Sequence, residues 1–91
     1  MTLERLKMER SRLLAELAAL DERIRQARLE IAERIDIGDV ADVPKMAVNA
    51  LRARGLRTLA DAVRLGRSRL AQVPNVGPKA VSAIFRAFDD I

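Results

Sequence analysis

The stretch VPNVGPKAVSAIF, residues 73–85, is the most specific local pattern in this 91-residue chain. Pro74 and Gly77 mark a tight turn, and Pro78 has the fixed φ that suits the first position of a helix. The apolar residues that follow recur at helical spacing and would form one buried face; they are Val81, Ile84, Phe85 and Phe88. The stretch therefore predicts a turn followed by an amphipathic helix.

The first turn of this expected helix has the chemistry of an anion-binding site. Its N–H groups have no intrahelical acceptor and lie at the positive end of the helix dipole. Gly77 has no side chain to block a ligand, and Lys79 adds a positive charge beside these donors. A phosphate would fit there.

The same residues resemble a helix-hairpin-helix motif. Its usual order is an apolar residue, Pro, a turn residue, an apolar residue and Gly, with apolar positions four and seven residues later. The matching residues are Val73, Pro74, Asn75, Val76, Gly77, Val81 and Ile84. An ordinary corner between two helices that binds nothing is the alternative, because a motif match is only a hypothesis.

Charge is unevenly distributed along the chain. Lys and Arg number 17 against 13 acidic residues, but residues 44–88 hold nine basic side chains and one acidic one, Asp61, which gives 9 − 1 = +8. Such a segment attracts polyanions, although an acidic protein would also suit it. The arginines that could extend a nucleic-acid contact are Arg52, Arg54, Arg57, Arg64, Arg67, Arg69 and Arg86.

Catalysis lacks its usual residues, because the chain has no His and no Cys. We therefore expect a protein that is not an enzyme, with no cofactor and no metal site. The N-terminus carries charges and no uninterrupted apolar run, so we expect neither a membrane span nor a signal peptide and a cytoplasmic location.

From Leu3 the apolar residues follow a heptad pattern that contains no Gly or Pro, which predicts a coiled coil. The residues on this stripe are Leu3, Leu6, Leu13, Leu17, Leu20, Ile24, Ala27 and Ile31, with Arg10 and Arg34 at the two remaining core positions. A helix of about 35 residues is ~52 Å long, further than a small globule can cover. We therefore expect a homodimer through residues 3–34.

The flanking charges favour an antiparallel pair. A parallel pair would place Glu16 by Asp21 and Arg23 by Arg28, which are both repulsive. An antiparallel pair centred near residues 18 and 19 would place Glu16 beside Arg23 twice, although it also brings Glu9 near Glu30 and Lys7 near Arg28.

The rest of the chain predicts short helices and no strand, hence an all-α fold. Gly38 is expected to cap the long helix, which divides the chain into a dimerisation helix at 1–37 and a compact domain at 39–91. After an acidic connector, the domain should hold helices from Pro44 to Gly55, from Thr58 to Gly66, around Ser68–Gln72, and from Pro78. Thr58 and Asp61 have the spacing of a capping box.

Residues 39–88 resemble the C-terminal domain of the bacterial RNA polymerase α subunit. The resemblance rests on Asn49, Leu51, Gly55, Thr58 and Val63, and on Val73, Asn75, Val76, Gly77 and Lys79. It implies a compact helical domain with helix-hairpin-helix units that binds the minor groove of A·T-rich promoter DNA and contacts transcription factors. It also implies a DNA-facing surface made of Asn49, Gly77 and Lys79, with Lys45 beside them.

This chain departs from the family at two positions. The family's principal DNA-binding arginine falls on Met46, and the hydroxyl residue after the hairpin lysine is Ala80. Groove selectivity is therefore open, and Met46 would be a core residue or a protein contact. We expect a duplex DNA-binding protein that works in transcription or another nucleoid transaction. The backbone of Asn75–Gly77 and Lys79 would bind phosphates, with Asn49 and Lys45 beside them. The alternative is an adaptor that mimics the polymerase domain to bind polymerase or a transcription factor; RNA binding is weaker, since no exposed aromatic platform is expected.

Overall fold

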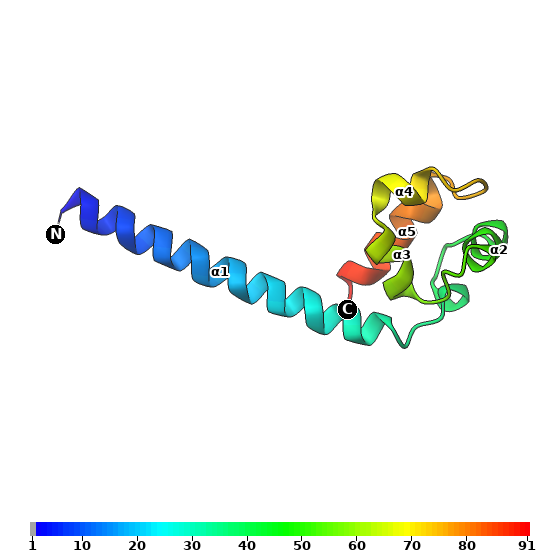
Figure 1. Cartoon of the computed structure of the whole chain (residues 1–91), viewed down its shortest axis with the longest axis horizontal. Coiled ribbons are helices and arrows are strands. Elements are labelled where there is room, and N and C mark those ends of the chain that lie inside the picture. The colour runs from blue at the N-terminus through cyan, green and yellow to red at the C-terminus, as the bar shows by residue number, and fades with distance from the viewer. Residues whose placement is uncertain (1) are drawn as a thin grey trace.

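The computed structural model describes residues 2–91, which form five α-helices and one short 3-10 helix, η1. Their bounds are α1 Leu3–Ala32, η1 Ile37–Asp39, α2 Lys45–Ala53, α3 Leu59–Leu65, α4 Arg67–Ala71 and α5 Pro78–Asp89. Figure 1 shows α1 as a rod that leaves a compact domain formed by the other helices, and the molecule measures 60 × 24 × 20 Å. The expected all-helical fold with a long N-terminal helix is confirmed for the described residues.

The prediction that Gly38 caps the long helix is wrong, because α1 ends at Ala32. The chain then pairs with the segment before α3: the Ile37 N–H donates to the Arg57 carbonyl at 2.9 Å, and the Leu59 N–H donates to the Ile35 carbonyl at 2.9 Å. This two-bond antiparallel bridge satisfies backbone groups that a longer helix would have used itself.

Gly38 belongs to η1, where its backbone N–H donates to Asp36 Oδ1 at 2.7 Å. A Cβ added to Gly38 would lie 2.7 Å from a terminal nitrogen of Arg52, which also donates to Asp36. A side chain at this position would displace the end of Arg52 from Asp36.

The later helices follow the sequence prediction closely. The capping box is confirmed: the Asp61 N–H donates to Thr58 Oγ1 at 3.1 Å, and the Thr58 N–H donates to Asp61 Oδ2 at 3.1 Å. Gly66 ends α3 at φ +92°, where an L side chain is strained, and Pro78 opens α5.

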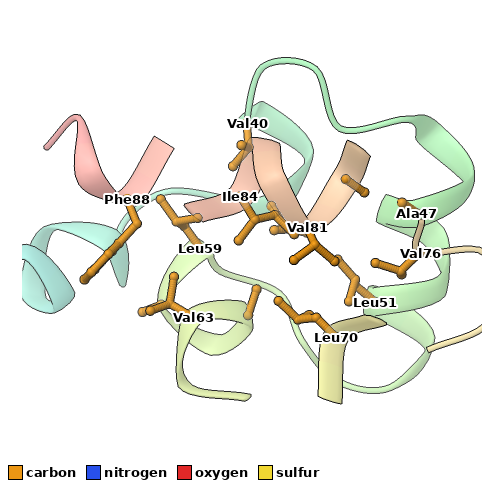
Figure 2. Packing of buried hydrophobic residues seen from close by; sticks show 14 of the residues in the cluster. Val40, Ala47, Leu51, Leu59, Val63, Leu70, Val76, Val81, Ile84 and Phe88 are labelled. Carbon is orange, nitrogen blue, oxygen red and sulfur yellow. The ribbon is translucent and has the colours of Figure 1, made fainter. Parts of the chain in front are cut away.

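One apolar core joins all the helices of the domain to the end of α1. Figure 2 shows Leu51 of α2, Leu59 and Val63 of α3, Leu70 of α4 and Ile84 of α5 pointing toward one another. The core also contains residues that precede the expected domain; these are Leu29, Ala32 and Ile37. The last turn of α1 is thus part of the domain's packing.

Polar contacts hold α1 in the same place. Glu33 forms an ion pair with Arg64 of α3, and Arg28 Nε donates to the carbonyl oxygen of Ile91 at 3.3 Å. The C-terminus accordingly lies beside α1 in Figure 1. Within residues 2–91, no helix is both long enough and apolar enough to cross a membrane.

Candidate nucleic-acid interface

The turn between α4 and α5 is anchored by two buried valines and presents its polar residues to solvent. Val73 and Val76 are buried in the core, and the Val76 N–H donates to the Val73 carbonyl at 3.1 Å. Asn75, which lies between them, is exposed and has φ +70°, a conformation that Asn tolerates better than most residues. Val76 therefore offers a ligand no side chain, and its N–H is already used within the turn.

The N-terminus of α5 is open. Gly77 is its N-cap residue, no side chain caps the helix, and the first turn contains no acidic residue. By contrast, Thr2 caps α1 and Thr58 caps α3, and each of those helices has an acid in its first turn. The short helix α4 also begins without a side-chain cap and without an acid. Lys79 is exposed in the uncapped turn, so a positive charge stands at the positive end of the dipole.

Gly77 is not required by the fold. Its φ of −86° and ψ of 176° are ordinary for any residue, and a Cβ added there would meet no atom within 4 Å. Local packing gives no reason for a glycine at this position. The absence of a side chain leaves the N–H groups of the α5 first turn accessible.

A second uncapped helix begins close to the hairpin. Pro44 is the N-cap residue of α2 and makes no side-chain cap, and Lys45 is in a first turn without acids. Figure 2 shows Ala47 of this turn and Val76, which precedes α5, on the same side of the core. Lys45 and Asn49 are exposed there and line a shallow groove, which Asp39 also lines.

The arginines of the basic segment divide into two groups. Three of them are engaged within the chain: Arg52 binds Asp36 at 2.8 Å, Arg64 pairs with Glu33, and the Arg67 guanidinium lies 4.4 Å from the centre of the Phe85 ring. The exposed arginines for which the described structure shows no such contact are Arg54, Arg57, Arg69 and Arg86.

Two acidic residues beside the basic segment, Asp36 and Asp61, accept hydrogen bonds from the fold, while a third, Asp39, lines the groove with Lys45. Asp61 accepts hydrogen bonds from the N–H groups of Arg57 and Thr58, and the first of these is the main cause of its lowered pKa. Hydrogen bonds from the Gly38 N–H and then from Arg52 lower the pKa of Asp36. Both carboxylates therefore stay ionised and are already satisfied by donors of the fold.

Comparison with protein-family models, with curated proteins and with solved structures finds no match to this chain.

Of the predicted site residues, Lys45 and Asn49 line one groove, while Asn75, Gly77 and Lys79 are exposed around the start of α5. The Val76 side chain is buried. We did not predict from the sequence that α2 and α5 both begin without a capping side chain and without an acid. The stretches Pro44–Lys45 and Gly77–Pro78–Lys79 could have shown it, because neither contains a capping residue with a polar side chain or an acid. Met46, expected in the core or at a protein contact, is 66% exposed, which rules out the core.

Proposed function

We propose that this protein is a non-enzymatic duplex DNA-binding protein that contacts phosphates through the N-terminal turns of α5 and α2. The observation that carries the proposal is that α5 and α2 both begin without a side-chain cap, each with a lysine and no acid in its first turn.

The energetics of the free protein support an anionic ligand. A cation near a helix N-terminus is unfavourable by roughly the 0.3–1 kcal/mol that an anion there would gain. Lys45 and Lys79 both bear this cost in the free protein. A phosphate bound to the open N–H groups would offset this cost, because the helix dipole and the lysine both attract its negative charge.

The rest of the surface suits a duplex rather than a small phosphate ligand. The exposed arginines of the domain add charge beyond the two helix ends, and a phosphate backbone repeats its charge over such a distance. The resemblance of residues 39–88 to the polymerase α-subunit domain, and of the hairpin to a helix-hairpin-helix, supports transcription as the process.

The direct test is a titration of duplex DNA at several salt concentrations. Each neutralised phosphate contributes roughly −0.9 to the slope of log K against log salt, so Lys79→Ala should flatten the slope by about one. Lys7→Ala is the matched control, because it removes the same charge from α1 far from the hairpin. Equal effects of the two substitutions, or no DNA binding at low salt, would refute the proposed interface.

A second candidate function is an adaptor that binds polymerase or a transcription factor. Met46, in the first turn of α2, is 66% exposed, which favours this candidate because a flexible apolar side chain suits an adaptable protein contact. In that case the surface near Lys45 and Asn49 would contact protein.

Met46→Arg separates the two candidates. If α2 docks in the minor groove, the added guanidinium should raise DNA affinity, and more for A·T-rich duplexes, whose narrow groove concentrates negative potential. Ala53→Arg, at the exposed C-terminal end of the same helix, is the matched control for charge alone. A small gain that is equal on both duplexes and in both variants would mean that α2 does not enter the groove.

A further inference from the structure

The apolar stripe of α1 stays open along its whole length, including the part beside the domain. Leu29 and Ala32 are 6% and 0% exposed because the domain packs on them, yet Ile31, between them in sequence, is 50% exposed. At about 100° per residue, Leu29 and Ala32 lie on a different face of the helix from Ile31. The domain therefore occupies one face of α1 and leaves the stripe free.

We propose that a second copy of this chain covers the stripe as an antiparallel coiled coil centred between residues 18 and 19. The stripe from Leu3 to Ile31 is ~42 Å long at ~1.5 Å per residue. The described remainder of the chain is folded at one end of α1 and leaves the stripe exposed (Figure 1). A second copy offers a surface of the same length and periodicity.

The antiparallel register makes the stripe complementary to itself. The opposed core pairs are Leu17 with Leu20, Leu13 with Ile24, Leu6 with Ile31, Arg10 with the small Ala27 and, at the ends, Leu3 with Arg34. In a parallel register, Arg10 would face the same residue of the other copy, which would place two like charges at the core. In the antiparallel arrangement each Arg10 lies opposite an alanine. Its aliphatic stem can pack there while its guanidinium group reaches water.

The charges beside the stripe favour the same direction. Glu16 of each copy lies beside Arg23 of the other, which gives two attractive contacts near the centre. A parallel pair would replace them with Glu16 facing Asp21 and Arg23 facing Arg28. Two like-charge contacts, Lys7 with Arg28 and Glu9 with Glu30, are also formed in the antiparallel pair, but nearer its ends, where solvent screens them better.

This arrangement separates the two domains. Ala32 of one copy lies level with Arg5 of the other, so the points where the domains join the rod are ~40 Å apart. The dimer would thus present two basic surfaces rather than one. The dimer itself does not depend on DNA binding, and it is tested without DNA.

Sedimentation equilibrium of the full chain at tens of micromolar should give twice the chain mass of 10.1 kDa. Leu17→Asp should weaken the dimer at least about 100-fold, because two carboxylates would be buried against leucine. Met8→Asp is the matched control: Met8 is 74% exposed and lies outside the stripe, so the dimer should persist. A monomeric full chain, or equal effects of the two variants, would overturn the proposal.

Disulfide trapping tests the direction, and the chain has no cysteine of its own. When Leu6→Cys and Ile31→Cys proteins are mixed and oxidised, the mixed disulfide should dominate. Both positions are exposed in the single chain, so neither substitution disturbs the core. Predominant disulfides between identical variants would indicate a parallel pair and overturn the antiparallel register.

Discussion

Gly77→Asp should make the protein more stable and abolish most of its DNA binding. The fold accepts a side chain here, because an added Cβ meets no atom within 4 Å and φ is ordinary. Aspartate is among the best N-cap residues, and its charge suits the positive end of the dipole. We expect the free energy of unfolding to rise by about 0.5–1 kcal/mol, or roughly 2–6 °C in Tm.

The same carboxylate should compete with the DNA. It would accept hydrogen bonds from the N–H groups that the proposal assigns to a phosphate, and it would repel that phosphate beside Lys79. Loss of one such charged contact corresponds to about 1.5–3 kcal/mol, hence an affinity about 10- to 100-fold weaker at low salt. Unfolding would lower both stability and affinity. A higher Tm together with weaker binding therefore cannot be caused by unfolding.

Two controls separate the causes of this effect. Gly77→Ser caps the helix without a charge, so it should weaken binding less than aspartate does. Ser11→Asp makes the same change in net charge on the exposed face of α1, far from the hairpin, and should alter affinity only slightly. If Gly77→Asp raises Tm but leaves DNA affinity unchanged, the start of α5 is not a phosphate site.

The sequence predicted the later helices well because their ends are marked by local chemistry. Thr58 with Asp61, Gly66 and Pro78 each act through hydrogen bonds or dihedral angles within a few residues. The end of α1 was missed because it depends on a bridge between Ile35–Ile37 and Arg57–Leu59, which are more than 20 residues apart. No local pattern contains that pairing.

The boundary between rod and domain shows the same limit. Leu29 and Ala32 fall at outer positions of the heptad, so the pattern assigned them to solvent. The structure buries them instead, because the domain packs on that face of α1. The sequence did carry a signal for this packing, since two apolar residues three positions apart lie next to each other on the outer face of the helix.

For the candidate interface, the sequence predicted Lys45, Asn49 and the turn before α5. Only the packing shows which arginines are engaged elsewhere in the fold.

A fragment of residues 39–91, the domain as its sequence suggests, should not fold on its own. It lacks Ile37 and Leu29, each of which contributes about 1.5–3 kcal/mol by burial, and both bridge hydrogen bonds, at about 1 kcal/mol each. The sum of about 5–8 kcal/mol is comparable with the whole stability of a domain of ~60 residues, about 3–9 kcal/mol. A fragment of residues 24–91 retains these contacts and is the matched control. Circular dichroism on heating should show a cooperative transition for 24–91 and none for 39–91, whereas similar midpoints in the two fragments would mean that the end of α1 only rests on the domain.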